Sequence, residues 1–588
     1  MTPPTRVHGR VRLTAGLLAA SMAVLTACGG ASSDSAKPDQ DGGKSRQSLA
    51  LNAAAGESGL AEAGKPQRGG DLIYGLESES TAGFCLSEAN LAISGMTVAR
   101  AFYDTLTVPN AEGGYTPYLA KSVTPNADYT AWTIKLRPDV TFHDGSKLDA
   151  TVVKNNLDAY RGTYPGRSSL LFTFILTDVA DTRVVDPLTV EVTTKRPWVS
   201  FPAYLFSSAR LGIMAQAQLD ASATDCANHP IGTGPFSFVS WTKNQELKGE
   251  ANPDYWQIAP DGKPYPYVDT IAFRPIPDDS VRVNAVEAGD VSLIHTDEGD
   301  PIKNSLAPMR DEGKINLFVS DDQAEVNFLQ LNTSIPPFDD LRMRQALAHA
   351  VDREDSNRRL NAGLLQVASG PMGPGSMGYL TDPGMPAYDP AAARKLIEQY
   401  KADTGDDGSF IVTSGPSPSD KRNAEQIQRQ AEAVGLKVTV QSVDQSALID
   451  RAIAGEYQGM VFRNFPGGDP DENYVWWYGD GNLVNFGKWD DAELNALLDQ
   501  GRQTADPAAR KKIYQDVNRI MATKVYGLWN TYALWAIALG PNVHNVLGPP
   551  LPGADPSKPG DATTDDLARQ PSTGLATAHP LLGMWISK

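Results

Sequence analysis

The sequence predicts an α/β fold with two lobes, and three observations lead to that prediction. From Asp389 to Phe462, helical and extended patterns alternate at the spacing of βαβ units, which predicts a parallel sheet covered on both faces. Near the middle, the buried strand Val326–Leu331 is followed by a Pro-Pro corner and a capped helix, as suits a crossing point between two lobes. The apolar segment 525–539 suits the return crossing.

Length and charge exclude some classes of protein. The chain has 588 residues and a net charge of −18. It lacks the basic stripe that a phosphate-binding surface needs, so we expect no nucleic-acid partner. After the amino-terminal segment, no apolar run approaches the roughly 20 residues of a transmembrane helix. We therefore expect the mature chain not to span a membrane.

The amino terminus has the pattern of a secretion signal. Three arginines precede the apolar run 13–25, which is too short to span a bilayer comfortably. The following Leu-Thr-Ala-Cys at 25–28 resembles the lipobox of bacterial lipoproteins, which implies acylation of Cys28, with chains such as palmitate. The alternative is a cysteine that follows an apolar run by chance. We expect a signal peptide at 1–28 and a lipid anchor as the only membrane contact.

Residues 29–67 are predicted to be a flexible tether. They contain no aromatic residue and are rich in Gly, Ser, Ala, Asp and Lys, so they cannot bury enough apolar surface to order themselves. A flexible chain of about 40 residues has a root-mean-square span of roughly 35 Å, enough to hold a globular body clear of a bilayer.

Two further cysteines remain, Cys85 and Cys226. An exported protein matures in an oxidising compartment, where two leftover thiols usually pair. We predict a disulfide between them; two separate buried thiols are the alternative.

Capping and periodicity place the remaining elements. Asp339 is expected to cap the central helix, with Met343, Ala346 and Leu347 on its apolar stripe and Arg344 pointing elsewhere. The other expected elements are a strand at 69–75, a helix at 93–101, a strand at 132–136, a helix capped by Asp149, a hairpin at 184–190, a helix opened by Asp389, a strand at 410–413, a helix opened by Asp420, a strand at 436–440, a helix at 447–453 and strands at 460–462 and 581–586.

Collinear phrases resemble a known family. The string N-x(4)-PFDD-x-R-x-RQAL-x(2)-A-x-DR at 332–353 is similar to the central signature of family 5 extracytoplasmic solute-binding proteins, the peptide and nickel receptors of ABC importers. YTAWT-x-KLR near Gly145, GTGPF at 232–236 and NPDYW at 252–256 follow the same order as in that family. The resemblance implies an α/β, two-lobed periplasmic-binding-protein fold (type II, large peptide-receptor subclass) with an interlobe ligand cleft.

The expected division of the mature chain follows from these phrases. Lobe I is predicted at 68–325 with an inserted subdomain at about 101–230, lobe II at 326–532, and a return to lobe I at 533–588.

No signature of catalysis or of a cofactor is found. The sequence has no G-x-S-x-G, H-E-x-x-H or P-loop motif, and its seven histidines have no ligand-like spacing. Asp469, Asp471 and Glu472 only loosely resemble a calcium loop, so a solvated acidic turn is preferred. We expect no enzyme activity, no cofactor and no metal.

The ligand site is predicted on the loop after the strand at 460–462, because ligands of open α/β sheets lie at the carboxyl ends of strands. The resemblance supports this placement, with the strand pairing its backbone with the ligand. The expected ligand-binding residues are Phe462, Arg463, Asn464 and Phe465 on the strand, Asp469 on the loop, Trp476, Trp477, Phe328, Trp529 and Tyr532 as walls, and Glu77 and Ser78 from the opposite lobe.

The sequence departs from the family pattern at Pro466. In peptide-binding members a carboxylate four residues before the proline of the Asp-Pro pair clamps the amino terminus of the peptide, and counting back from Pro470 gives Pro466. Either Asp469 takes that role, or the ligand lacks an ordinary free amine. Arg463 could instead bind a carboxylate or phosphate group.

The resulting hypothesis is a monomeric, exported, lipid-anchored receptor of an ABC importer. It would capture an oligopeptide or a similar solute and deliver it to a permease and, through the permease, to ATPase subunits. A receptor for an oligosaccharide, a nickel chelate or another metabolite is the alternative within the binding class, and an exported hydrolase the alternative outside it.

Overall fold

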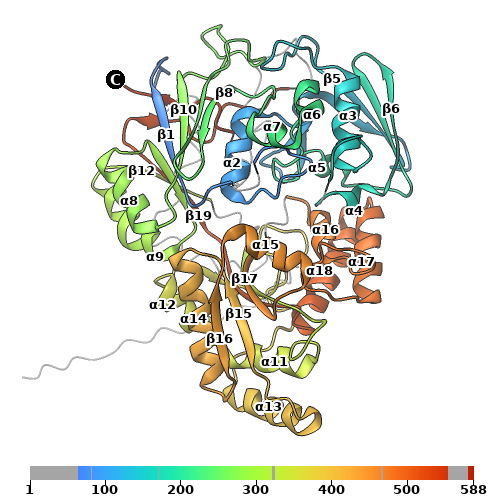
Figure 1. Ribbon diagram of the computed structural model, residues 1–588, viewed down its shortest axis with the longest axis vertical. Coiled ribbons are helices and arrows are strands. Elements are labelled where there is room, and N and C mark those ends of the chain that lie inside the picture. Colours follow the sequence, from blue (N-terminus) through green and yellow to red (C-terminus); the bar gives the residue numbers. More distant parts are fainter. Residues whose placement is uncertain (1–63, 81–82, 170, 321–324, 465–467, 554–579) are drawn as a thin grey trace, which may run out of the picture. The chain divides into compact units, whose positions relative to one another are not determined.

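The computed structural model describes residues 64–80, 83–169, 171–320, 325–464, 468–553 and 580–588 (Figure 1). Cys28, the predicted signal peptide and residues 29–63 of the predicted tether lie outside them. No helix of the described residues has both the length and the apolar character needed to cross a membrane.

A seven-stranded sheet carries the first part of the chain. Its order is β12-β19-β11-β1-β10-β9-β8, and β1 runs parallel to β10 and β11 while the other pairs are antiparallel. The strands are β1 (Asp71–Leu76), β8 (Phe236–Thr242), β9 (Glu246–Ala251), β10 (Thr270–Pro275), β11 (Leu293–Thr296), β12 (Asn316–Ser320) and β19 (Trp535–Leu539). The helices that follow its strands include α2 (Ile93–Phe102), α8 (Asp279–Ala288), α9 (Gly299–Pro301), the π-helix η2 (Ile302–Leu306) and α10 (Ala307–Asp311).

A six-stranded sheet carries the second part, in the order β14-β18-β13-β17-β15-β16. Its strands are β13 (Val326–Leu331), β14 (Gln366–Val367), β15 (Phe410–Ser414), β16 (Val438–Ser442), β17 (Gly459–Asn464) and β18 (Gly527–Tyr532). The helices are α11 (Leu341–Ala350), α12 (Arg353–Leu360), α13 (Pro390–Thr404), α14 (Pro418–Glu432) and α15 (Gln445–Ala454). β15 pairs with β16 and β17 in parallel, as the alternating pattern from Asp389 to Phe462 predicts. β13, β14 and β18 add antiparallel pairs, so the sheet as a whole is mixed.

A four-stranded antiparallel sheet lies beside the first large sheet, in the order β4-β5-β7-β6. Its strands are β4 (Ala120–Pro125), β5 (Ala131–Leu136), β6 (Val179–Asp186) and β7 (Thr189–Thr194), and the nearby helices are α3 (Ala150–Tyr160), α4 (Thr173–Leu176), α5 (Phe201–Tyr204), α6 (Gln216–Asp220) and α7 (Ala223–Asn228). Next to α4 lie elements from the end of the second part, namely η3 (Pro470–Asn473), α16 (Tyr474–Trp477), α17 (Ala492–Gln503) and α18 (Pro507–Thr523) (Figure 1). Two antiparallel two-stranded sheets complete the described fold, β2 (Thr107–Pro109) with β3 (Tyr115–Pro117), and β20 (Val543–His544) with β21 (Trp585–Ile586).

The chain passes between the two large sheets at two adjacent places. Between β12 and β13 it leaves the seven-stranded sheet, and between β18 and β19 it returns to it. A hydrogen bond of 2.9 Å from the Ala533 N–H to the Glu325 carbonyl joins the two crossings. Glu325 therefore sits where the two sheets meet.

Two helix starts differ from the prediction. The cap of α11 is Asp340, whose carboxylate accepts from the Arg342 N–H, and not Asp339. The cap of α14 is Ser417, because the hydroxyl of Ser417 accepts from the Asp420 N–H and Pro418 suits the first helical position. Arg344, which the sequence places away from the apolar stripe of this helix, is nevertheless buried. Its guanidinium donates to the carbonyls of Phe338 and Lys524.

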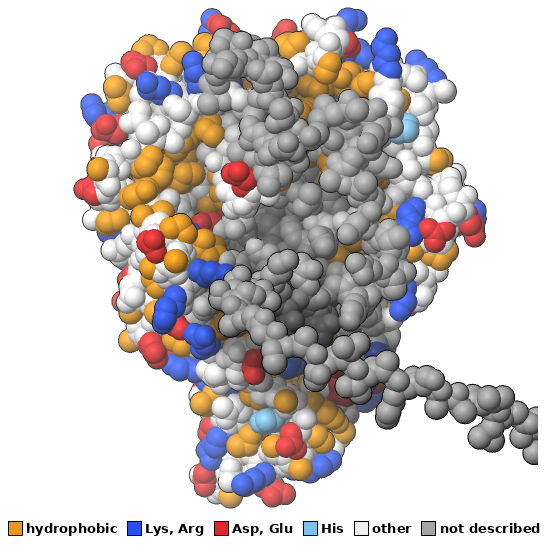
Figure 2. Space-filling model, turned by 180° about the vertical axis from the view of Figure 1, so that it is seen from behind, with side chains coloured by type: hydrophobic (Ala, Val, Ile, Leu, Met, Phe, Trp, Pro, Cys, Tyr) orange, Lys and Arg blue, Asp and Glu red, His pale blue; other side chains and the backbone are white. Residues whose placement is uncertain are grey.

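Charged side chains of both signs are interspersed over the described part of the surface seen from behind (Figure 2). The described surface of this face shows Lys and Arg beside Asp and Glu, so the net acidity of the chain is not gathered there.

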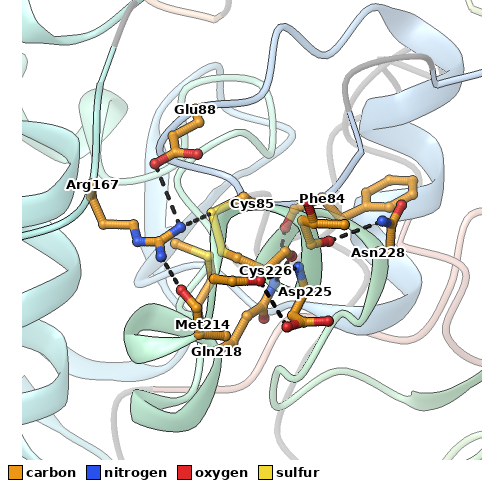
Figure 3. Close-up of a disulfide and its surroundings, with 12 residues drawn as sticks. Phe84, Cys85, Glu88, Arg167, Met214, Gln218, Asp225, Cys226 and Asn228 are labelled. Atoms are coloured by element: carbon orange, nitrogen blue, oxygen red, sulfur yellow. Dashed lines mark hydrogen bonds and ion pairs between the residues drawn. A yellow bond between two sulfur atoms is a disulfide. The ribbon is translucent and has the colours of Figure 1, made fainter.

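A disulfide joins Cys85 to Cys226, both of which are buried (Figure 3). The Gln218 side chain donates to the carbonyl of Cys226 at 2.8 Å and to the carbonyl of Phe84 at 3.1 Å. Arg167 donates to Cys85 Sγ at 3.1 Å and lies 3.5 Å from Glu88. The bond ties the segment before α2 to α7, across a sequence separation of 141 residues.

Replacing both cysteines by alanine is expected to lower the free energy of unfolding by about 2–5 kcal/mol, because the unfolded chain loses a long cross-link. Chemical denaturation of the exported protein and of the C85A/C226A variant measures the difference. A reducing agent should destabilise the parent protein only. Free thiols at both cysteines in the non-reduced mass spectrum would contradict the pairing.

Candidate functional site

The edge of β17 is partly open. β17 pairs with β13 from Gly459 to Asn464, but with β15 only at Gly459 and Met460. Along residues 461–464, the edge that faces away from β13 has no strand partner within the described part of the sheet. Backbone N–H and C=O groups on such an edge can pair with an extended ligand.

A cavity of about 500 Å³ lies at the end of β17 and is lined by both large sheets. The seven-stranded side contributes Glu77 and Ser78 after β1, Asp279 and Arg282 on α8, and Asp297 and Glu298 after β11. The six-stranded side contributes Phe328, Arg353, Asn357, Asp420, Phe462, Arg463 and Asn530. Carboxylates outnumber arginines among all lining residues, so this cavity is acidic.

Arg463, on a strand of the six-stranded sheet, forms ion pairs with residues that follow strands of the seven-stranded sheet. From β17 its guanidinium lies 2.5 Å from Glu77 Oε1 and 2.8 Å from Asp297 Oδ1, with Glu325 Oε1 at 3.9 Å. It also lies over the ring of Trp535, at 5.2 Å from the centroid. Arg463 thus already has two close carboxylates, and its positive charge is compensated within the protein.

Two carboxyl groups of this region have raised pKa values. Burial, together with Asp297 and Asp279, raises the pKa of Glu298 to about 8. Burial also raises the pKa of Glu325 to about 7, although Arg463 acts in the opposite direction. Neighbouring carboxylates contribute to both shifts. The arginines that line the larger cavity therefore do not fully offset its negative charge.

A second cavity of about 400 Å³ adjoins the same strand. More of its lining residues are apolar than in the larger cavity. Val461, Phe462, Arg463 and Asp420 line both cavities. The walls of the second cavity alone include Leu91, Ile93, Met96, Leu171, Leu448, Ile449, Trp476 and Phe486, with Arg210, Glu325, Asp450 and Asn464 as polar members.

Arg210 enters this second cavity from a strained turn. Ser207, Ser208 and Ala209 all have positive φ, at 41°, 56° and 66°, and all are buried. Left-handed backbone costs an L-residue roughly 1–2 kcal/mol. Burial lowers the pKa of Arg210 to about 10.

A buried ionic network supports the loop after β17. Asp471 in η3 and Arg502 in α17 are fully buried, with Arg502 Nε 3.2 Å from Asp471 Oδ2. Arg502 also lies 2.8 Å from Asp178 beside the four-stranded sheet. The Trp198 and Ser200 side chains donate to Asp471 at 3.1 and 2.5 Å. This network fixes η3 and α17 against the smaller sheet.

The structure brings some predicted ligand residues together and leaves others apart. Glu77, Ser78 and Phe328 line the larger cavity, Asn464 and Trp476 the smaller one, and Phe462 and Arg463 line both. Trp477, Trp529 and Tyr532 are buried in the core and line neither cavity. Phe465 and Pro466 lie outside the described residues.

Asp469 also lies apart from both cavities. It caps η3 and forms an ion pair with Arg510 at 2.6 Å, so its charge is already compensated. The three acidic residues of this loop each have a protein partner, with Glu472 accepting from the Tyr115 hydroxyl at 2.6 Å. Within the described part of the chain, no group of three His, Cys, Asp or Glu side chains is arranged to hold a metal ion.

Sequence reasoning missed the acidic residues after β11, and also Glu325, Asp420 and Arg210. Asp297 and Glu298 directly follow the end of a strand, as Glu77 does. Their position after a strand end could therefore have identified them as site residues. Arg210 gave no such signal, because it lies in an irregular segment far from β17 in the sequence.

Residues 114–485 match the family described as bacterial extracellular solute-binding proteins, family 5 Middle. The glutathione-binding protein GsiB of Pectobacterium atrosepticum is 30% identical over 361 residues, which are 61% of this chain and 66% of that protein. The chain thus spans just under two thirds of this curated relative.

Two solved structures share the fold. The periplasmic binding protein DppA of Helicobacter pylori, in complex with the peptide STSA, has a TM-score of 0.74 at 20% identity, over 89% of this chain and 99% of that one. The oligopeptide-binding protein AppA of Bacillus subtilis, in complex with a nonapeptide, has a TM-score of 0.73 at 22% identity, over 89% and 100%. The predicted two-lobed periplasmic-binding-protein fold of the peptide-receptor type is therefore confirmed.

Replacing Arg502 by methionine is expected to lower the free energy of unfolding by about 3–5 kcal/mol, because the buried charge of Asp471 loses its main counter-charge. Urea unfolding of the parent protein and of the variant measures this difference in the free energy of unfolding. Arg519→Met is the matched control: Arg519 is 49% exposed and pairs with Asp516, so its loss should cost less than about 1 kcal/mol. Equal effects of the two variants would contradict the role of the network.

Stability should depend on pH through Glu298. The pKa of Glu298 is about 8 in the folded protein, whereas an unfolded glutamate titrates near 4.3, so between these values the folded state binds more protons. This contribution makes the unfolding free energy fall as pH rises from 5 to 8. We therefore expect Glu298→Gln to stabilise the ligand-free protein more at pH 8 than at pH 5.

Denaturation at the two pH values tests this. Glu425→Gln, at a residue 52% exposed on α14, serves as the control and should show the same effect at both. An effect of Glu298→Gln that is independent of pH would contradict the expectation.

Proposed function

Because the chain belongs to the bacterial extracellular solute-binding proteins of family 5, we propose that it is the solute receptor of an ABC importer. It captures an oligopeptide or peptide-like solute between its two lobes and delivers it to a membrane permease. The observation that carries this proposal is the open edge of β17 at 461–464 beside the two cavities. Backbone pairing along that edge gives affinity that does not depend on the side chains of the peptide.

The lobes are proposed to be residues 68–325 with 533–588, and residues 326–532. Ligand would stabilise the closed arrangement in a hinge motion about the two crossings, because it contacts both sides only when they are together. Arg463 supports this, since its ion pairs with Glu77 and Asp297 connect the two large sheets.

For localisation we propose an exported protein held at the outer face of the cell membrane by acyl chains on Cys28. The lipobox-like sequence supports the anchor, and the extracellular solute-binding family supports the export. Labelling with a radioactive or alkyne fatty acid, compared between the parent protein and Cys28→Ser, tests the anchor.

A peptide ligand should raise the thermal stability of the purified protein. At 100 times its dissociation constant a ligand adds about 2.7 kcal/mol. A screen of di- to hexapeptides, amino-blocked peptides and glutathione, with oligosaccharides and nickel chelates as competing classes, identifies the ligand class by its shift in Tm.

Backbone N-methylation of a peptide that binds is the matched control. It removes an N–H donor and leaves the side chains in place, so binding should weaken by 10-fold or more at positions that pair with β17. Binding of a sugar or nickel chelate with no binding of any peptide would overturn the proposed ligand class. Turnover of a ligand would overturn the receptor function.

A further inference from the structure

We propose that the larger cavity binds a guanidinium-bearing side chain of the solute, next to the carboxyl groups of Glu298 and Asp420. The inference rests on the proposed function, because it assigns a chemical class to part of the same ligand site. It concerns a positive charge on a side chain of the solute, and not the amino terminus of a peptide. The receptor would then select basic solutes from among the peptides that the edge of β17 can hold.

The lining of the larger cavity carries more negative charge than its arginines offset. Carboxyl side chains outnumber arginines along it by seven to three. Two of these arginines, Arg282 and Arg463, are paired with carboxylates that line the same cavity. The third, Arg353, donates to the backbone carbonyls of Ala368 and Trp529 instead. A solute that enters this cavity therefore meets an excess of negative charge, which favours a cation.

Glu298 and Asp420 have no close cationic partner within the described part of the chain. Glu298, whose side chain is 17% exposed, lies 3.9 Å from the guanidinium of Arg422, and the Arg422 side chain is 50% exposed. Asp420 forms no ion pair with a described residue, and its carboxylate is hydrogen bonded to Ser417. Burial raises the pKa of both carboxyl groups. Each of them would be stabilised in its ionised form by a cation that enters with the solute.

Asn357 on α12 adds a neutral acceptor to the same lining. It is 4% exposed, and its Nδ2 donates to the carbonyl of Leu365 at 2.6 Å, which fixes the orientation of the amide. Its Oδ1 accepts no hydrogen bond from the described residues. An unpaired buried acceptor costs free energy, so this side chain favours a ligand that brings N–H donors.

The arrangement favours an organic cation over a metal ion. The described residues offer no group of three His, Cys, Asp or Glu side chains arranged to hold a metal. A guanidinium has five N–H donors in one plane, so it can reach acceptors that are spread over a cavity of about 500 Å³. The side chains of a peptide strand point away from the plane of its sheet. A side chain of a peptide paired with β17 can therefore extend from the strand edge toward the walls of the cavity.

Binding of such a cation should release a proton from Glu298. The pKa of Glu298 is about 8 in the ligand-free protein, because of burial and the neighbouring carboxylates. The charged groups around it are Asp297 beside it, Asp279 and Arg282 on α8, Asp420 and Arg422 on α14, and Arg463 on β17. A cation beside Glu298 favours the ionised form and lowers this pKa. Between pH 6 and 8, binding should release up to about one proton per solute molecule, and affinity should rise with pH.

The test compares arginine with citrulline, whose side chain has a similar shape but carries a neutral ureido group. The peptide probes are tripeptide pools with arginine or citrulline in the middle and Ala, Leu or Phe on both sides. Each pool is made with a free and with an acetylated amino terminus. Butylguanidinium and butylurea are the matched probes without a peptide backbone, and Ca²⁺ is the metal probe. Calorimetry in buffers of different ionisation enthalpy measures affinity and proton release together, and shifts in Tm measure stabilisation.

Three proteins are compared: the parent, the double variant Glu298→Gln/Asp420→Asn, and the control Glu425→Gln. Glu425 also lies on α14, but it is 52% exposed and lines neither cavity. The two amides of the double variant keep the size of the side chains and remove their charge. The ligand-free Tm of the double variant should equal or exceed that of the parent, because buried carboxyl groups without a close cation are lost.

We expect the parent and Glu425→Gln to bind the arginine pools about 30-fold more tightly than the citrulline pools, whether or not the amino terminus is acetylated. The double variant should reduce this ratio to about 3-fold or less, with its affinity for the citrulline pools unchanged. Proton release on binding of the arginine pools should disappear in the double variant. A merely structural role of the two carboxyl groups would lower the ligand-free Tm and weaken the binding of both pools alike.

An equal affinity of the parent for the arginine and citrulline pools would overturn the proposal, as would an arginine preference that survives in the double variant. A dependence on the free amino terminus without a dependence on the guanidinium would also overturn it, because the amine would then be the group that is recognised. Stabilisation by Ca²⁺ and not by butylguanidinium would replace the organic cation with a metal ion.

The same measurements separate this inference from the proposed function. If no peptide binds but butylguanidinium stabilises the parent and not the double variant, the cation site stands and the peptide function fails. If peptides bind without regard to their charge, only the cation site falls. If no probe binds, both fail.

Discussion

The contact between the guanidinium of Arg463 and the carboxylates of Glu77 and Asp297 is the interaction on which the candidate site depends. Arg463 projects from β17 of one large sheet, and its partners follow β1 and β11 of the other. Coulomb attraction at these distances is stronger than in bulk water, because the Glu77 and Asp297 side chains are largely buried. The two cavities lie at this junction, so any ligand there must bind close to a charge that is already compensated.

The acidic character of the larger cavity follows from this arrangement. Two of its carboxylates pair with Arg463 and one with Arg282, while Glu298 and Asp420 lack a comparable close partner among the described residues. Burial and mutual repulsion raise the pKa of both of these groups. Binding of a charged group there would shift the protonation of Glu298, whose pKa is about 8.

The supporting layer behind β17 is ionic rather than apolar. The Asp471 carboxylate receives hydrogen bonds from Trp198, Ser200 and Arg502, which satisfy most of its acceptor capacity. Such a buried network is stable only when all its members are present. It fixes the position of η3 and α17 relative to the four-stranded sheet, and so places Trp476 at the wall of the smaller cavity.

The sequence by itself determined the family, many of the strands and helices in their order, and the two crossings. These depend on local patterns: alternation of apolar residues, capping by Asp149 and Asp389, and the signature at 332–353. It also located the strand 462–464 and the opposite Glu77 and Ser78, because both follow strand ends.

Tertiary structure decided which side chains face the cavities. Trp477, Trp529 and Tyr532 have the composition of a pocket wall but pack into the core, since helical and strand periodicity near a crossing does not define which face is inward. Asp469 pairs with Arg510, and antiparallel strands from the two crossings join the expected parallel ones to make a mixed sheet. Arg210 and Glu325 reach the site from segments 253 and 138 residues before Arg463, so no local pattern could connect them to it.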